Sequence, residues 1–311
     1  MSSYLVTGGA GFIGSHIATA LAERGERVRV LDNLSTGKRQ NLAHLGDQVE
    51  LVVGDLLDQE AVRRAMTSVE VVYHQAALAS VPRSVAKPLD THAACVTGTL
   101  NVLEAARQAN ARRVVYAGSS SAYGNQPVKT KRESDLPQPL SPYAAAKLSG
   151  EYYCRAFTET YNLETVIIRY FNVFGPRQDP TSEYSAVIPL FVTAMLAGQR
   201  PTIFGDGSQS RDFTYIDNVV RGNLAAATAP GAVGRVFNVA CGQQFSLLDL
   251  IASINSVLST NIEPKFDEWR AGDVRESLAD ISSARELLGY EPSVTFEEGL
   301  RRSIEYYRSL M

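Results

Sequence analysis

Residues 7–15 read Thr-Gly-Gly-Ala-Gly-Phe-Ile-Gly-Ser, and this stretch joins an apolar run to a segment with helical spacing, Phe12–Glu23. Its spaced glycines are Gly8, Gly11 and Gly14. Between a strand and a helix, the first glycine permits a tight turn, the second lets the backbone approach a pyrophosphate, and the third allows close helix–strand packing. The free N–H groups that open the helix then favour an anion. The stretch predicts a dinucleotide-binding βα unit.

The first half of the chain continues this alternation of strand and helix. After Tyr4–Thr7, the β-rich runs are Val28–Leu31, Val49–Val53, Val69–His74, Arg113–Ala117 and Thr165–Tyr170, and the later helical stretches are Glu60–Met66, Thr97–Asn110 and Tyr143–Tyr161. Buried strands separated by helices are typical of a parallel sheet with helices on both faces. We therefore expect an α/β fold with a doubly wound parallel sheet of the Rossmann type.

The second half is punctuated by Gly-Pro, Asp-Pro and Gly-Asp-Gly turns from residue 175 onward. Its expected helices are Ala186–Leu196, Asp217–Ala227, Leu247–Leu258 and Phe296–Ser309. This change predicts a dinucleotide-binding domain over 1–175 and a smaller α/β substrate domain over 176–311. The strand-like run Val236–Val239 predicts that a segment near 212–241 returns to the first sheet, so that the two domains are interleaved.

Composition narrows the class of protein. The 311 residues include 45% hydrophobic and 20% charged side chains, which excludes disordered and fibrous classes. Thirty Lys and Arg against 33 Asp and Glu give a net charge of −3, so a nucleic-acid partner is not expected. Cys95, Cys154 and Cys241 form no CxxC pair, which predicts neither a disulfide framework nor a cysteine-rich zinc site. With no signal peptide and no apolar run of about 18 residues, we expect a cytoplasmic protein that does not span a membrane.

Asp32 ends the second β-rich run. Such a carboxylate accepts hydrogen bonds from the adenosine ribose and repels a 2′-phosphate, which favours NAD, although Arg39 leaves NADP as an alternative. Asp55 and Gln75 follow the next two strands, at the sheet edge where ligands bind in open α/β folds. His74 is expected to be a packed strand-end residue.

A catalytic group is indicated by Tyr143 and Lys147, which lie one helical turn apart after Ser141-Pro142. A free tyrosine is a poor base at neutral pH, but an ammonium and a positive nicotinamide ring would lower its pKa. Ser119, at the end of a strand, is placed to share the substrate proton.

With these motifs the chain resembles the extended short-chain dehydrogenase/reductase family over essentially its whole length, and within it the UDP-hexose 4-epimerases. The carrying residues are Thr7–Gly14, Asp32, Ser119–Gly124, Tyr143, Lys147, Arg169–Gly175, Arg211–Asp217 and Arg270–Asp273. The resemblance implies permanently held NAD, with Tyr143 as base, Lys147 on the nicotinamide ribose and Ser119 assisting. It also implies a homodimer that pairs the helices near Thr97–Asn110 and Tyr143–Tyr161.

The resemblance implies further contacts to the cofactor and to a UDP-sugar. Additional cofactor positions are Phe12, Ile13, Asn33, Ser35, Thr36, Gly37, Leu56, Ala76, Ala77, Ala79, Tyr170 and Val173. Arg211 and Arg270 would hold the diphosphate, Asp273 the ribose and Asn172 the sugar–phosphate. Val187, Ile188 and Phe204 would line the uracil pocket, and Ser80, Val81, Arg83, Ser120 and Ser121 would lie near the sugar.

At two places the sequence differs from other members of the family that it resembles, and both bear on the activity. The motif Ser119-Ser120-Ser121-Ala122-Tyr123-Gly124 lacks the acidic residues that elimination of water requires, which favours epimerisation over dehydration. Cys95 stands where relatives commonly have Asn, so that amide contact is not expected and the thiol is expected to be buried.

Ser277 stands where epimerases selective for UDP-glucose and UDP-galactose carry Tyr. A serine leaves room for a 2-N-acetyl group, which predicts UDP-GlcNAc and UDP-GalNAc as substrates, with the non-acetylated pair also accepted. A UDP-glucuronate 4-epimerase, with Arg83 or Arg177 facing the C6 carboxylate, is the alternative. A nucleotide-sugar oxidoreductase or dehydratase and a non-catalytic NAD-sensing protein are more distant ones.

Overall fold

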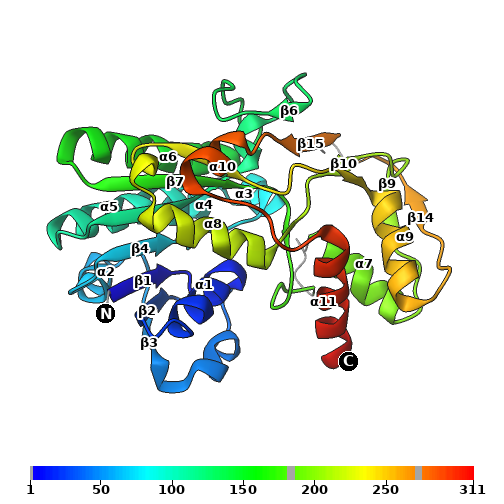
Figure 1. Ribbon diagram of the computed structural model, residues 1–311, viewed down its shortest axis with the longest axis horizontal. Helices are drawn as coiled ribbons and strands as arrows, with labels where there is room; N and C mark the ends of the chain where they lie inside the picture. Colours follow the sequence, from blue (N-terminus) through cyan, green and yellow to red (C-terminus); the bar gives the residue numbers. More distant parts are fainter. Residues whose placement is uncertain (1–2, 181–185, 270–274) are drawn as a thin grey trace.

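The computed structural model describes residues 3–180, 186–269 and 275–311. Its largest element is a seven-stranded sheet in the order β12-β7-β5-β4-β1-β2-β3, with every neighbouring pair parallel (Figure 1). The strands are β1 (Ser3–Thr7), β2 (Arg27–Asp32), β3 (Val49–Val53), β4 (Val71–His74), β5 (Arg113–Ser119), β7 (Glu164–Tyr170) and β12 (Val236–Val239). The predicted doubly wound parallel sheet is confirmed.

Helices cover both faces of this sheet. On one face α1 (Phe12–Ala22) packs against α8 (Ile216–Thr228); on the other lie α2 (Gln59–Met66), α5 (Gly98–Gln108) and α6 (Pro142–Tyr161). The chain builds outward from β1 to β3 and then from β4 toward β12, so the direction of winding reverses between β1 and β4. Such a reversal opens a crevice at the carboxyl ends of the strands, where ligands bind.

Three consecutive helical segments between β4 and β5 differ from the single helix that the sequence predicts there. They are α3 (Val81–Ala86), α4 (Pro88–His92) and a π-helical turn, Ala93–Thr97, which runs directly into α5. The predicted start at residue 97 therefore falls within a longer helical run. Pro82 and Pro88 stand in the first turns of α3 and α4, where a missing N–H costs nothing.

The remaining elements lie mainly at one end of the large sheet, on the right in Figure 1. The helices at that end are α7 (Val187–Leu196), α9 (Leu247–Leu258) and α11 (Phe296–Ser309), whereas α10 (Ser282–Leu288) packs against α8 and against β12 of the large sheet. A small sheet has the order β13-β10-β15-β6, from Phe245–Ser246, Ser210–Arg211, Glu276–Ala279 and Thr130–Lys131. Two further pairs join β11 (Thr214–Tyr215) to β8 (Val173–Phe174), and β14 (Lys265–Asp267) to β9 (Thr202–Phe204).

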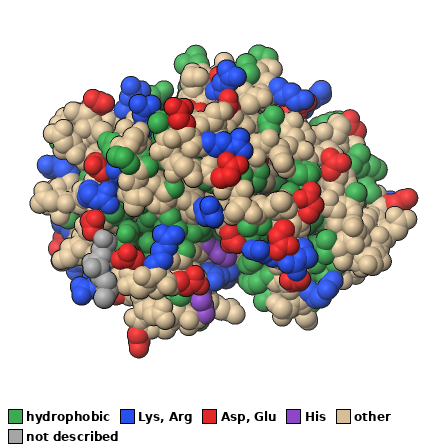
Figure 2. Space-filling view, in the orientation of Figure 1, with side chains coloured by type: hydrophobic (Ala, Val, Ile, Leu, Met, Phe, Trp, Pro, Cys, Tyr) green, Lys and Arg blue, Asp and Glu red, His purple; other side chains and the backbone are tan. Residues whose placement is uncertain are grey.

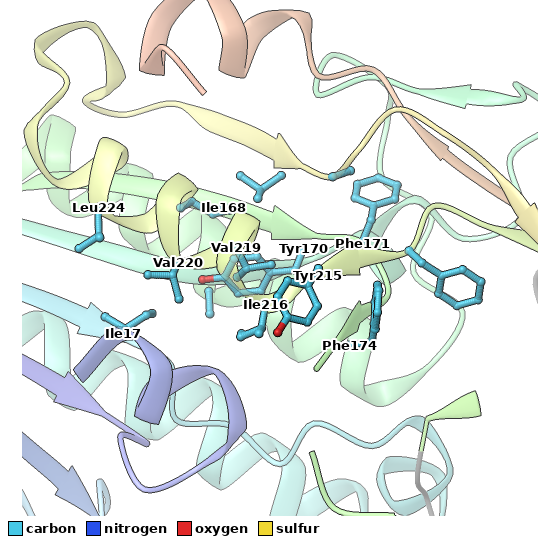
Figure 3. Close-up of a cluster of buried hydrophobic side chains, with 14 of the residues drawn as sticks. Ile17, Ile168, Tyr170, Phe171, Phe174, Tyr215, Ile216, Val219, Val220 and Leu224 are labelled. Carbon is cyan, nitrogen blue, oxygen red and sulfur yellow. The ribbon is translucent and has the colours of Figure 1, made fainter. Parts of the chain in front are cut away.

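One apolar cluster runs through both halves of the chain. Figure 3 shows part of it: Ile17 of α1, Ile168 of β7 and Val220 of α8 lie at one side of the cluster, and Phe174 lies at the other, beside Tyr215. The Phe174 ring contacts Phe296 of α11 at a centroid distance of 5.9 Å. The strand β12 comes from beyond residue 175 but belongs to the large sheet, and the apolar core includes residues from both sides of residue 175. The two halves of the chain are therefore interleaved, and the domain division at residue 175 stays a prediction.

Charges of both signs are mixed over the face shown in Figure 2. None of the helices within the described parts of the chain combines the length and apolar character that a membrane span needs.

Candidate active site

The glycine turn between β1 and α1 holds two glycines, Gly8 and Gly14, that a residue with a Cβ could not replace without a shift of the backbone. Gly8 has φ +66°, a conformation that L side chains rarely adopt, and a Cβ there would lie 2.7 Å from the backbone of Ala76. A Cβ on Gly14 would lie 2.3 Å from the Gly8 carbonyl oxygen. At Gly11, by contrast, a Cβ would approach only that same oxygen, at 3.1 Å. The space beside Gly11 is therefore open for a ligand.

The start of α1 carries no competing negative group. Its N-cap is Gly11, which makes no side-chain cap hydrogen bond, and its first turn holds no acidic residue. The N–H groups of this turn and the helix dipole favour an anion. This arrangement fits the pyrophosphate of a dinucleotide.

Asp32 lies beside the same turn, at the end of β2. Its Oδ2 accepts a hydrogen bond from the Ala10 amide at 3.0 Å, and its Oδ1 accepts one from the Leu34 amide at 2.8 Å. A carboxylate has about four acceptor positions, so these bonds orient Asp32 and leave capacity for hydroxyl donors. Asn33 donates to Asp55 at 2.7 Å, which joins the ends of β2 and β3. The predicted cofactor-binding residues Asp32, Asn33 and Asp55 thus lie together at the carboxyl ends of β2 and β3.

The catalytic candidates come from two neighbouring elements, β5 and α6. The Ser119 hydroxyl lies 2.8 Å from that of Ser121, and Ser119 lies near enough to Tyr143 to act to lower the pKa of its phenol. Tyr143 and Lys147 follow one another on the same face of α6, which packs against β5. The helix begins here because Ser141 caps it by accepting from the Ala144 amide, with Pro142 in the first turn. The structure thus brings the three predicted catalytic residues together.

Burial sets the protonation of this group. It raises the pKa of Tyr143 above the ordinary value, and the hydrogen bond with Ser119 only partly opposes this. Burial also lowers the pKa of Lys147, which is 2% exposed, while Cys95 and Glu151 act to raise it. The Lys147 ammonium lies 4.4 Å from the ring centroid of Tyr116, where the aromatic face stabilises a cation. Burial therefore favours the neutral phenol of Tyr143, and a positive charge placed near its hydroxyl would oppose this effect.

A buried ion pair supports this helix, and the sequence reading missed it. Glu151, one turn beyond Lys147, accepts from Arg169 of β7 at 2.7 Å, and both side chains are buried. Arg169 also lies 4.6 Å from the ring centroid of Tyr123, whose hydroxyl donates to Asn238 of β12 at 2.6 Å. Two features of the sequence could have indicated this ion pair. Glu151 continues the four-residue spacing of residues 143 and 147, and Arg169 is a charged residue inside the apolar run of β7.

The histidine and cysteine near the site are both packed. His74 is fully buried between the hydroxyls of Thr7, at 2.7 Å, and Thr99, at 2.9 Å, and burial lowers its pKa to about 3. Cys95 is buried in the π-helical turn, where its carbonyl accepts from Thr99. Both environments match the packed residues that the sequence predicted.

A cavity of about 300 Å³ lies at the other end of the site. Its walls include five residues predicted to contact a UDP-sugar, namely Asn172, Val187, Ile188, Phe204 and Arg211. Val173, predicted near the cofactor, also lines it, and so do Phe213, Leu247 and Gln209. A mostly apolar slot that has an arginine in its wall suits a planar base linked to a phosphate.

Asp212, next to Arg211, fixes the wall of this cavity. Its carboxylate accepts from the amides of Cys241 and Gly242, at 2.9 and 3.0 Å, and from Ala279 of β15 at 3.3 Å. Ser277 of β15 pairs in register with Arg211 of β10, so the two side chains leave the small sheet on the same side. Arg270 and Asp273, predicted to bind diphosphate and ribose, lie outside the described residues.

The two arginines considered for a C6 carboxylate differ in their surroundings. Arg177 donates to Ser15 and Thr19 of α1, at 3.3 and 3.1 Å, and approaches His44 at 3.2 Å. It is therefore bound to the outer side of α1, and the expectation that it faces the sugar is not supported. Arg83 lies in α3, at the helix start that Ser80 caps.

Comparison with known proteins follows this geometry. Residues 4–240 match the profile of the NAD dependent epimerase/dehydratase family. The chain is 40% identical over 309 residues to UDP-glucose 4-epimerase of Mycolicibacterium smegmatis, covering 98% of both. It is also similar to the structure of UDP-N-acetylglucosamine 4-epimerase from Methanobrevibacter ruminantium with UDP-N-acetylmuramic acid, at 41% identity and TM-score 0.96, covering 100% of this chain and 99% of the other. The chain is also similar to the structure of UDP-glucuronic acid 4-epimerase from Bacillus cereus in complex with UDP-glucuronic acid and NAD. The sequence identity is 34% and the TM-score 0.93, with 99% of this chain and 100% of the other covered.

Proposed function

This chain belongs to the NAD dependent epimerase/dehydratase family, and on that premise we propose that it catalyses the reversible C4 epimerisation of a UDP-hexose. The observation that carries the proposal is the meeting of Ser119, Tyr143 and Lys147 at the carboxyl edge of the large sheet. No acidic residue stands in the Ser119–Gly124 stretch. A transient oxidation without loss of water is the chemistry that such a group supports.

The fit of NAD to the chain rests on the open space at Gly11, the uncapped start of α1 and the oriented carboxylate of Asp32. When bound, NAD would supply an acceptor for the C4 hydride in its oxidised form and, once reduced, the donor that returns a hydride to C4. Its positive ring in the oxidised form would also oppose the effect of burial on Tyr143.

In the proposed reaction, Tyr143 takes the proton of the C4 hydroxyl and later returns one. Lys147, one turn along α6, holds positive charge near the phenolate and hydrogen-bonds the nicotinamide ribose. Ser119 hydrogen-bonds both the phenol and the C4 oxygen, which keeps the two in line. The three side chains can therefore remove or return the C4 hydroxyl proton whichever C4 stereoisomer of the sugar is bound.

Inversion requires the 4-ketosugar to present its other face while the nucleotide stays bound. Arg211 and Asn172 line the nucleotide cavity and would hold the phosphates, together with Arg270, while Asp273 would hold the ribose. The sugar then turns about the diphosphate linkage. The protein must therefore bind the nucleotide tightly and leave the sugar free to rotate.

We further propose UDP-GlcNAc and UDP-GalNAc as substrates, with UDP-Glc and UDP-Gal also accepted. The support is the small Ser277 beside Arg211, and the name of the 41% identical M. ruminantium protein.

An isomerase assay across UDP-Glc, UDP-GlcNAc and UDP-GlcA tests this choice. We expect a product of equal mass and no net NADH from the first two, with the higher kcat/KM for UDP-GlcNAc. Turnover of UDP-GlcA alone would make the chain a UDP-glucuronate 4-epimerase. A product lighter by one water would identify a dehydratase, and no turnover with any of the three would contradict the proposed function.

We propose that two copies of the chain pair through α5 and α6. The support is a set of exposed apolar side chains on α6 and on α3 and α4 beside it: Tyr152 is 58% exposed, Leu89 82% and Val85 64%. Exposed apolar side chains that lie together on neighbouring helices are typical of protein–protein contacts.

Sedimentation velocity tests the dimer. The wild-type chain is expected to sediment as a dimer and Tyr152→Glu as a monomer, because a charge would be buried at the contact. Leu310→Glu, an exposed leucine at the end of α11, is the matched control and should remain dimeric. A monomeric wild type would contradict the proposal.

The domain division at residue 175 and a cytoplasmic location are also proposed. The three free thiols, with no disulfide among the described residues, support a reducing compartment.

A further inference from the structure

Tyr116 of β5 touches Lys147 in two places. Its hydroxyl donates to the Lys147 carbonyl oxygen at 3.1 Å, and its ring centroid lies 4.4 Å from Lys147 Nζ. The side chain is fully buried in the apolar cluster between β5 and the helices α5 and α6. One tyrosine therefore contacts both the backbone and the charged end of the lysine.

The helix fixes where this ring lies. Gly150 of α6 has no side chain, and a Cβ there would lie 2.5 Å from Cζ of Tyr116 and nearer still to its hydroxyl oxygen. The hydroxyl thus reaches the helix backbone because residue 150 is glycine. The ring also packs against that of His74, at a centroid distance of 5.6 Å. These contacts leave the ring little freedom to turn away from Nζ.

The Lys147 ammonium has no other direct partner among the described residues. Nζ makes no hydrogen bond or ion pair with any of them, and Lys147 is 2% exposed. Burial disfavours the charged form of such a group and lowers the pKa of Lys147. The negative face of an aromatic ring opposes this effect, most strongly where water is excluded.

The titratable groups around Lys147 do not replace the ring. They are His74 of β4, Tyr116 of β5, Cys95 of the π-helical turn, and Tyr143, Glu151 and Cys154 of α6. Burial lowers the pKa of His74 to about 3 and raises that of the Cys154 thiol, so both are neutral near pH 7. Glu151 is the carboxylate of this set, and it is bound to Arg169.

We propose that Tyr116 is a positioning residue for the reaction, whose ring keeps the Lys147 ammonium charged and in place on the face of α6 that Tyr143 shares. The inference rests on the proposed function, which gives Lys147 its part in the proton transfer. Because the ring favours the cation, weakening its negative face should let Lys147 lose its proton at a lower pH. Activity on the alkaline side should then be lost at a lower pH as well.

Fluorinated phenylalanines at position 116 test this role. Fluorine withdraws electron density from the face of the ring and changes its shape little. Tyr116→Phe, followed by trifluoro- and pentafluorophenylalanine at the same position, should therefore weaken the contact with the cation in steps. Tyr116→Phe is the reference, because it loses the hydroxyl and keeps the ring.

The measurement is an NMR titration of the full-length NAD-loaded protein with isotope-labelled lysine side chains. The signal that is missing from Lys147→Met identifies Lys147. We expect Tyr116→Phe to keep the wild-type midpoint within about 0.3 of a pH unit, and the pentafluoro ring to lower it by about 1. The alkaline limb of kcat should move in the same direction, with KM for the UDP-sugar near that of the wild type.

Tyr73 of β4 is the matched control. It is 1% exposed, and it belongs to the apolar cluster on the opposite face of the sheet, where its ring stacks on Tyr4 at 6.0 Å. Pentafluorophenylalanine at position 73 should leave the Lys147 midpoint and the pH profile of kcat unchanged.

A Lys147 midpoint that stays the same across the fluorinated series overturns the inference. An equal shift from the substitution at position 73 overturns it too, because the effect would then belong to fluorine in the core and not to the Tyr116 ring. If the pentafluoro variant does not fold, the trifluoro variant decides by the same criterion. The titration needs no turnover, so a wild type that epimerises no UDP-sugar contradicts the proposed function instead.

Discussion

Tyr143→Phe is expected to lower kcat for UDP-sugar epimerisation by about 10²–10⁴-fold, the range for loss of a positioned acid–base group. The substitution removes only the hydroxyl that bonds Ser119 and keeps the ring that packs on β5. Stability and NAD content should therefore remain near those of the wild type. A coupled assay with UDP-Glc and UDP-GlcNAc measures the loss.

The control for this variant is another tyrosine on the same helix. Tyr161 is the last residue of α6, is half-exposed and lies beside Arg107. It is at the opposite end of the helix from Tyr143. Tyr161→Phe should retain full activity. Near-normal turnover by Tyr143→Phe would show that another group moves the C4 proton, and the assignment of the catalytic tyrosine would fall.

Gly14→Ala and Gly11→Ala are expected to fail in different ways. At position 14 the new methyl would lie 2.3 Å from the Gly8 oxygen and 2.8 Å from the Gly9 Cα, so the turn must open. Overpacking of this kind lowers the free energy of unfolding by about 1–3 kcal/mol. Gly14→Ala should thus unfold at a lower urea concentration than the wild type. It should also bind NAD more weakly, because the turn that would hold the pyrophosphate is distorted.

Gly11→Ala should keep most of the wild-type stability, because its φ of −79° suits alanine and its methyl requires only the Gly8 oxygen, at 3.1 Å, to shift by a few tenths of an ångström. The methyl occupies the space where a pyrophosphate would lie, and NAD affinity should fall about 10–100-fold if the clash costs about 1–3 kcal/mol. Urea unfolding and NAD titration separate the two failures. Gly231→Ala, where a Cβ meets nothing closer than 3.8 Å, is the control. Unchanged NAD affinity in Gly11→Ala would contradict the cofactor site.

Sequence reasoning predicted the large sheet well because its strands are short runs rich in β-branched and aromatic residues, such as Arg113–Ala117, in which residues 114–117 are all buried. It also placed Tyr143 and Lys147 on one helix face, since the period of a helix fixes that directly. Strands of two residues, such as β10 and β13, were not predictable, because pairing with segments far along the chain defines them.

The missing parts of the site have the same origin. Arg177 carries a charge that suits a carboxylate, yet the fold turns it toward Thr19 of α1, and only tertiary structure decides that choice. Gln209 is an ordinary polar residue in the sequence. The fold buries its side chain and bonds its amide nitrogen to the Phe204 carbonyl oxygen, an arrangement that only tertiary structure reveals.

The position of β12 at the edge of the large sheet has a consequence for how the chain folds during its synthesis. β7 ends at residue 170, but the strand that covers its outer edge begins at Val236. At about 5–20 residues per second, a ribosome leaves that edge uncovered for several seconds. An open strand edge is a template for pairing with another chain, so the nascent protein passes through an aggregation-prone interval that ends when β12 docks.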